Sequence, residues 1–148
     1  MTNKRGALLF LALWLAAGAA LAQVPDARRA HYNYLVYCRG CHLPDARGIA
    51  GKVPQIKGYV GNFLKVEGGR EFLVRVPGAA NAALDDAQLA ELLNWMIGEF
   101  AGSSMPVHFQ PYSAEEVARL RRHPMNEVRQ ARAALVARID SLQPRPAR

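Results

Sequence analysis

The chain has 148 residues, of which 51% are hydrophobic, and its 19 Lys and Arg outnumber its 12 Asp and Glu for a formal net charge of +7. This length suits one small domain with an appendage. The basic excess is concentrated in residues 113–148, where eight Arg face four acidic residues. Because these Arg are interspersed with acidic and apolar residues, they favour an acidic protein partner or a solvated helix face and argue against nucleic acid as a partner.

The first 22 residues have the pattern of a secretory signal peptide. A basic start precedes an apolar run from Ala7 to Leu21, and small residues occupy the A-x-A cleavage positions ahead of Gln23. The apolar run is short for a bilayer span of about 20 residues. We therefore expect removal of residues 1–22 and no integral membrane span in the remaining chain, with a retained membrane anchor as the alternative.

The remaining chain shows helix and loop patterns and no alternating strand pattern, which predicts an all-α fold. A first helix is expected to open near Asp26 and to run into Cys38. Residues 40–61 are rich in Gly and Pro, as irregular loops are, and short helices are expected at 62–66 and 70–76.

Three further helices are expected in the second half of the chain. Asp85 is an N-cap with Gln88 three residues later, and apolar residues then recur at helical spacing from Leu89 to Phe100, about three turns. Ser113 with Glu116 predicts a second capping box and helix. A last amphipathic helix is expected over residues 126–142.

Both cysteines lie in the sequence Cys38-Arg39-Gly40-Cys41-His42, which has the spacing of a c-type haem attachment motif. Two thiols on one turn can bond to the two vinyl groups of a haem, and the adjacent imidazole is then placed under the iron. The motif therefore predicts one covalently bound haem c, attached at Cys38 and Cys41, with His42 as the proximal iron ligand.

Three other interpretations of the motif are weaker. A structural zinc site needs four Cys or His ligands, and the chain has no second pair of cysteines. A thioredoxin-like redox pair needs a strand before the motif, where this chain has a helix pattern. A plain disulfide between Cys38 and Cys41 would leave His42 without a role.

The helix, the attachment motif, the Leu43-Pro44-Asp45 step, the Gly-rich loop and the later amphipathic helix together resemble class I mono-haem cytochromes c over about residues 26–100. The resemblance implies a cytochrome c fold around one haem, with the first and last core helices crossing beside it. It divides the chain into a signal peptide at 1–22, a cytochrome c domain at 23–112 and a basic helical C-terminal extension at 113–148.

The resemblance also suggests roles for individual residues. It implies that the backbone carbonyl of Pro44 accepts the imidazole proton of His42 and so fixes its tautomer. Trp95 is expected either to line the haem or to be an ordinary half-buried helix residue, with equal weight on each. Because c-type haem is attached after export, the motif and the signal pattern together predict a periplasmic protein.

The resemblance leaves the second axial ligand of the iron open. Class I cytochromes usually place a Met before the final core helix, where this chain has Val76-Pro77. Met105 is the expected ligand, because it lies in a loop followed by a capped helix and so repeats the family's order one element later. A vacant or labile position comes next and His108 third, whereas Met96 is expected to pack in the core.

The function implied by the resemblance is that of a periplasmic one-electron carrier between redox proteins, without enzymatic chemistry of its own. One alternative is a haem subunit docked on a periplasmic dehydrogenase through its Arg-rich tail. The other is a ligand-binding or peroxidatic haem protein with an open distal site.

Overall fold

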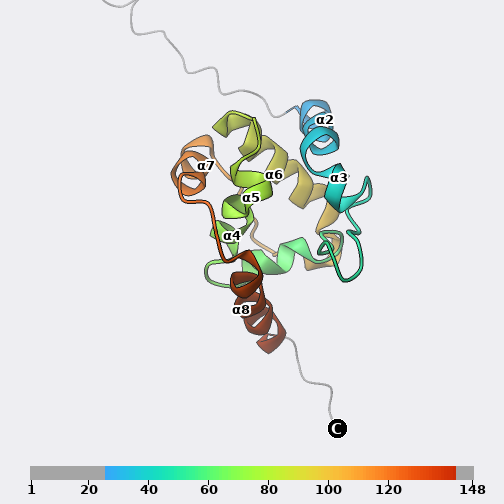
Figure 1. Cartoon of the computed structure of the whole chain (residues 1–148), viewed down its shortest axis with the longest axis vertical. Coiled ribbons are helices and arrows are strands. Elements are labelled where there is room, and N and C mark those ends of the chain that lie inside the picture. The colour runs from blue at the N-terminus through green and yellow to red at the C-terminus, as the bar shows by residue number, and fades with distance from the viewer. Residues whose placement is uncertain (1–25, 143–148) are drawn as a thin grey trace, which may run out of the picture.

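The computed structural model describes residues 26–142, so the expected signal peptide at 1–22 lies outside the described residues. The described part is built of helices and loops, with one isolated bridge between Ile49 and Val53, so it is all-α as expected (Figure 1). The elements are α2 (Ala27–Tyr37), α3 (Arg39–His42), η1 (Val60–Lys65), α4 (Gly69–Arg75), α5 (Pro77–Ala80), α6 (Asp86–Phe100), η2 (Gly102–Ser104), α7 (Ala114–Arg121) and α8 (Val128–Ser141).

Helices α2 and α6 pack against each other, as expected for the first and last core helices. Asp26 caps α2 through hydrogen bonds from the backbone N–H groups of Arg28 and Arg29. Asp85 and Gln88 form the complete capping box expected at the start of α6. The apolar face of α6 is buried, so local sequence signals and tertiary packing agree here.

Helix α4 packs against η1 through a stacked pair of aromatic rings. Phe63 of η1 and Phe72 of α4 lie 5.2 Å apart between ring centroids. The backbones also approach closely, because a Cβ on Gly69 would collide with the carbonyl of Phe63. This contact sets the position of α4, whose far end leads into the cavity described below.

Helix α7 of the C-terminal extension is joined to the core by ionic and aromatic contacts. Arg70 of α4 makes a bidentate pair with Glu116, with Nε–Oε1 and Nη2–Oε2 distances of 2.6 and 2.7 Å. The Arg70 guanidinium also lies 3.9 Å from the ring centre of Tyr112. The second capping box is only half formed, because Ser113 accepts from the Glu116 N–H at 3.2 Å while the Glu116 carboxylate turns to Arg70. The prediction of a full box was wrong at this point.

Helix α8 packs against η1 and α4. Its buried face carries Leu135 and Ile139, and Arg138 Nη1 donates to the carbonyl of Glu67 at 3.0 Å. The extension therefore completes the core. Within residues 26–142, no helix combines the length and apolar content that a membrane span requires.

Candidate functional site

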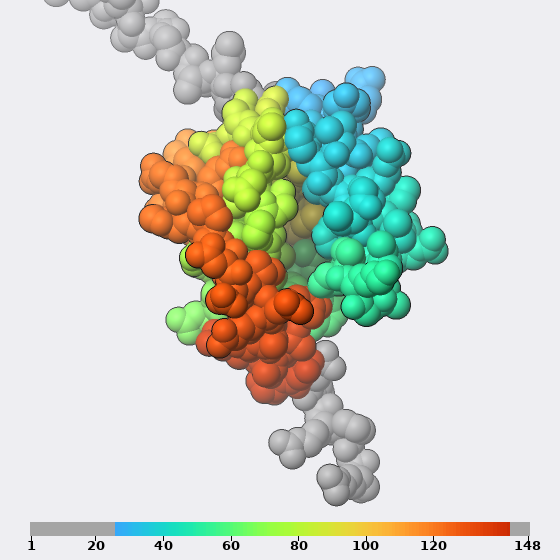
Figure 2. All heavy atoms as spheres, in the orientation of Figure 1, coloured from blue at the N-terminus to red at the C-terminus, as the bar shows by residue number. Residues whose placement is uncertain are grey.

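A cavity of about 340 Å³ opens between two halves of the molecule. Figure 2 shows it as a hollow, with α2, α3 and the following loop on one side, residues 77–85 on the other, and α8 below. Its walls are mostly apolar side chains from α4, α5 and α6. The size falls within the range of about 300–1,000 Å³ typical of cofactor and ligand pockets.

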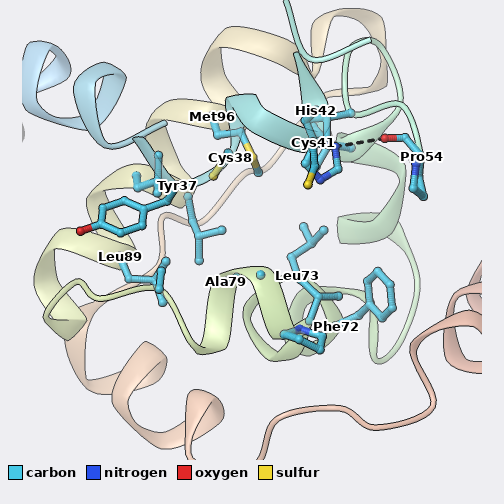
Figure 3. Close-up of a pocket in the computed structure, with 18 of the residues that line it drawn as sticks. Tyr37, Cys38, Cys41, His42, Pro54, Phe72, Leu73, Ala79, Leu89 and Met96 are labelled. Atoms are coloured by element: carbon cyan, nitrogen blue, oxygen red, sulfur yellow. Dashed lines mark hydrogen bonds between the residues drawn. The ribbon is translucent and has the colours of Figure 1, made fainter. Parts of the chain in front are cut away.

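The three residues of the attachment motif share one wall of this cavity. Cys38 lies at the junction of α2 and α3, and Cys41 and His42 lie on the single turn of α3. Figure 3 shows these side chains at the cavity. Both cysteines are free thiols, so the predicted attachment residues and proximal ligand are brought together.

The chain on either side of His42 is held by two hydrogen bonds. The buried Tyr34 hydroxyl donates to the Leu43 carbonyl at 2.7 Å, and burial raises the pKa of Tyr34 to about 12, so this donor stays protonated. The N–H of Gly48 donates to the His42 carbonyl at 3.0 Å. Gly48 has a φ of +69°, and a Cβ here would collide with the carbonyls of Val53 and Pro54. Only glycine fits without strain at this point.

The imidazole of His42 is oriented by Pro54. Its Nδ1 lies 3.1 Å from the Pro54 carbonyl oxygen. A carbonyl can only accept, so Nδ1 carries the proton and Nε2 keeps its lone pair for a metal. Burial lowers the pKa of His42, and the Pro54 hydrogen bond opposes that shift in part, so the ring is neutral at pH 7. The expectation that Pro44 is the acceptor was wrong, because the loop folds back to bring Pro54 to the ring.

The thiol chemistry of the motif does not fit a redox dithiol. Burial raises the pKa of the Cys38 thiol to about 11, with a smaller contribution from Cys41. Catalytic dithiols depend on a lowered thiol pKa that gives a thiolate near neutral pH. The helix α2 also stands where a thioredoxin-like site would need a strand. The two cysteines therefore suit covalent attachment better than thiol exchange.

Leu73 of α4 and Ala79 of α5 lie across the cavity from His42 (Figure 3). Val76, Pro77 and Gly78, which lie between them in the chain, also line the cavity, and we call these five residues the distal wall. Its side chains carry no nitrogen, oxygen or sulfur atom. Met96 also lines the cavity, but it belongs to α6 and is seen on the Cys38 side of the cavity in Figure 3, apart from Leu73 and Ala79.

The structure does not bring Met105 or His108 to the cavity. Met105 follows η2, and its backbone lies against Gly61 of η1. His108 is exposed and lines a separate small depression with Leu64 and Arg70. The chain after Phe100 turns at η2 against η1 instead of crossing the distal face, which is why the expected distal ligand lies elsewhere.

Trp95 is a half-buried helix residue outside the cavity lining. Its indole stacks on the exposed His31 ring, with 5.2 Å between ring centroids. It also contacts the rings of Tyr34 and Phe100. Of the two roles expected for Trp95, the structure shows packing between α2 and α6.

Sequence reasoning missed the contribution of α8. Val128 and Arg132 line the cavity. Among the described residues that line it, Arg132 is the only Lys, Arg, Asp or Glu. A shallow depression next to it is lined by Lys52, Arg129 and Arg132. The spacing of Val128, Arg132 and Leu135 indicates a buried helix face, but it does not say which cavity that face completes.

The residues present fit a c-type haem. Two thiols and a neutral imidazole on one wall of a mostly apolar cavity supply the donor set for two thioether bonds and one iron ligand. Arg132, which also lines the cavity, would supply positive charge to the carboxylates of a bound haem. The fit concerns the proximal side, since the distal wall offers no ligand.

Comparison with known proteins points the same way. No protein-family model matches the chain. A cytochrome c-552 from Thermus thermophilus is 32% identical over 136 residues, covering 80% of this chain and 86% of the relative. A second cytochrome c-552 from the same species is 32% identical over 102 residues, covering 57% of this chain and 78% of that relative. The chain therefore belongs to the c-type cytochrome family.

Proposed function

We propose that this protein carries single electrons between redox proteins, using one haem c attached to Cys38 and Cys41 with His42 as proximal iron ligand. The observation that carries the proposal is the placement of two free thiols and one oriented imidazole on the same wall of an apolar cavity. The similarity to two proteins named cytochrome c-552 supports it. The haem supplies reversible one-electron chemistry when bound.

The chain's own residues define the environment of that chemistry. The Pro54 carbonyl holds the His42 ring by its Nδ1 proton and makes it a stronger donor. The aliphatic residues of α4, α5 and α6 exclude water from the cavity. Arg132, with Lys52 and Arg129 in the neighbouring depression, supplies positive charge for the haem carboxylates. No residue in this arrangement is assigned catalytic chemistry on a substrate.

The proposed location is the periplasm. The support is the signal pattern in residues 1–22 of the sequence, together with a motif whose haem is attached after export. N-terminal sequencing of the exported protein tests this, with Gln23 as the expected first residue. Recovery of the intact N-terminus from the cytoplasm would contradict it.

The proposed partners are redox proteins with an acidic docking surface. Arg119, Arg122 and Arg129 are exposed on or next to α7 and α8, and rim charges of this kind mainly raise association rates at low salt. Deletion of residues 113–148 is a poor test, because α7 and α8 also complete the core. Charge reversal of Arg119 and Arg122, neither of which lines the cavity or the neighbouring depression, is cleaner, and we expect it to weaken partner association without changing the haem spectrum.

The haem assignment is tested by substitution. We expect haem staining to survive denaturing electrophoresis in the wild type and to disappear in Cys38→Ala/Cys41→Ala, because both thioether bonds are lost. His42→Ala should abolish the native spectrum, whereas the exposed His108→Ala should preserve it. Wild-type protein should show a reversible one-electron redox titration. Covalent haem in the double cysteine variant, or none in the wild type, would contradict the proposal.

A further inference from the structure

We propose that the haem face opposite His42 receives no ligand from the protein, so that a small neutral diatomic molecule such as carbon monoxide binds the iron there. The inference rests on the haem attachment proposed above. It is carried by the composition of the distal wall and by the hydrogen bonds that hold this wall in place.

The distal wall has no atom that can coordinate iron. Leu73 of α4 is buried, and Val76 joins α4 to α5. Pro77 at the start of α5 is followed by Gly78 and Ala79. All of these side chains are aliphatic or absent, whereas iron ligands in proteins are thioether, thiolate, imidazole or oxygen donors.

Two other side chains of the cavity lining carry an atom that could bind iron, but neither lies on the distal wall. Met96 of α6 lies on the Cys38 side of the cavity in the view of Figure 3, apart from Leu73 and Ala79. Tyr37 also lines the cavity, but its hydroxyl donates to the Ala83 carbonyl at 3.1 Å. Neither side chain belongs to the wall that faces His42.

The remaining methionines and the ends of the chain do not supply a ligand either. Met105 lies against Gly61, outside the cavity lining. The backbone N–H of Met125 donates to the Arg75 carbonyl at 2.9 Å, and this residue is also outside the lining. Residues 23–25 and 143–148 contain no His, Met, Cys or Lys in the sequence.

The segment that follows the distal wall is held from behind by Arg121 of α7. The Arg121 side chain is only 16% exposed, and it donates to the carbonyls of Ala80, Ala82 and Leu84 at distances from 2.7 to 3.1 Å. An ion pair with Asp86 at 3.2 Å completes its contacts. The segment cannot swing aside to admit Met105 without breaking these hydrogen bonds.

The chemistry of the wall selects the class of ligand. It has no side-chain donor to stabilise an anion or a polarised oxygen species, so it favours a neutral, weakly polar molecule. The cationic Arg132 lies at the edge shared with Lys52 and Pro54, on the side of the His42 hydrogen bond. Because such a ligand prefers reduced iron, its binding would raise the reduction potential and couple ligand binding to electron transfer.

The test uses the full haem-loaded protein. The ferric spectrum reports the far-red band of Met sulfur ligation, and titration of the dithionite-reduced protein with carbon monoxide reports an open site. We expect wild-type protein to lack the band and to bind carbon monoxide. Met105→Leu and Met96→Leu should leave both observations unchanged. Val76→Met places a thioether in the wall and should lower carbon monoxide affinity by about tenfold or more, because the site is then open for only a fraction of the time.

Two results would overturn the inference. One is a far-red band in the wild type that Met105→Leu or Met96→Leu abolishes. The other is reduced wild-type protein that fails to bind carbon monoxide, because a protein ligand then fills the site. Haem staining of the same samples separates the two proposals: no covalent haem would end both, whereas covalent haem without carbon monoxide binding would end this inference alone.

Discussion

Arg121 of α7 donates two hydrogen bonds to the carbonyl oxygen of Ala80, from Nε at 3.1 Å and from Nη2 at 3.0 Å. Ala80 is the last residue of α5, so a residue of the C-terminal extension holds the end of a helix that forms the distal wall. An Arg in a basic tail thus has a structural role that its surroundings in the sequence do not reveal.

We expect Arg121→Ala to lower the free energy of unfolding by about 1–3 kcal/mol or more, because it leaves carbonyls of the 80–84 segment without donors. The exposed Arg119→Ala on the same helix is the matched control and should change stability by less than about 0.5 kcal/mol. Denaturant unfolding followed by circular dichroism measures both. Equal stability of the two variants would show that water replaces the guanidinium at no cost.

The Arg70–Glu116 pair makes stability depend on pH. The hydrogen bond from Arg70 lowers the pKa of Glu116 below its usual 4.5. The ionised carboxylate therefore stabilises the fold fully at pH values above the pKa of Glu116 in the unfolded chain. This contribution is lost as the pH falls through the lower pKa of Glu116 in the folded protein. Unfolding should become easier below about pH 4.5 in the wild type.

In Glu116→Gln this part of the pH dependence should be absent, and the variant should be less stable at neutral pH. Glu99→Gln, on the exposed side of α6, is the control and should keep the wild-type profile. Denaturant midpoints measured from neutral to acidic pH give the comparison. If the denaturant midpoints of Glu116→Gln and wild type fall in parallel as the pH is lowered, groups other than Glu116 cause the loss of stability in acid.

The glycines of the loop after His42 provide a matched pair of variants. Gly48 and Gly51 have φ values of +69° and +72°, so alanine is strained at both. A Cβ at Gly48 would also collide with the Val53 and Pro54 carbonyls, whereas a Cβ at Gly51 meets nothing within 4 Å. Gly48→Ala should therefore cost more stability than Gly51→Ala, whose cost is about 1–2 kcal/mol from strain alone.

Displacement of Pro54 in Gly48→Ala should also weaken its hydrogen bond to His42. The imidazole then becomes a poorer donor, which raises the reduction potential of the haem relative to Gly51→Ala. Spectroelectrochemical titration of both variants measures this difference. Identical potentials would show that the Pro54 carbonyl follows the ring or that the loop relaxes elsewhere.

The Tyr34 hydroxyl fixes the Leu43 carbonyl directly after His42, the proposed iron ligand. Tyr34→Phe should lower the free energy of unfolding by about 1–2 kcal/mol, because the part-buried Leu43 carbonyl loses its donor. Tyr32→Phe is the control, since this residue lies two positions earlier on α2 and is 65% exposed. Thermal unfolding of the two haem-loaded variants should separate them, and a neutral result for Tyr34→Phe would mean that water reaches Leu43.

Sequence patterns predicted the features that are set locally. The Asp85–Gln88 capping box and the apolar period of α6 involve residues within a few turns of each other, and the structure has both. The Cys38-x-x-Cys41-His42 motif is equally local, and its three side chains share one wall. The family resemblance added the all-α cytochrome c fold.

Features that depend on tertiary contacts could not be predicted in this way. The acceptor for His42 is Pro54 instead of Pro44, because closure of the loop determines which carbonyl reaches the ring. The Glu116 carboxylate pairs with Arg70, which is 46 residues away in sequence, instead of completing a capping box with Ser113. Met105 has the local pattern of a ligand loop, but a local pattern does not determine the side of the core to which the chain turns.

The order of the cavity residues along the chain has a consequence for assembly. Cys38, Cys41 and His42 precede every residue of the opposite wall, and Val128 and Arg132 of α8 come last. When a chain emerges amino end first, the proposed attachment residues are therefore presented before the opposite half of the cavity has been made. A large planar cofactor can approach from the side that α5 and α8 later cover. Helix α8 adds Val128 and Arg132 to the cavity lining. Its contacts with the rest of the chain, such as that of Arg138 with Glu67, 71 residues away, form late because the intervening chain must fold first.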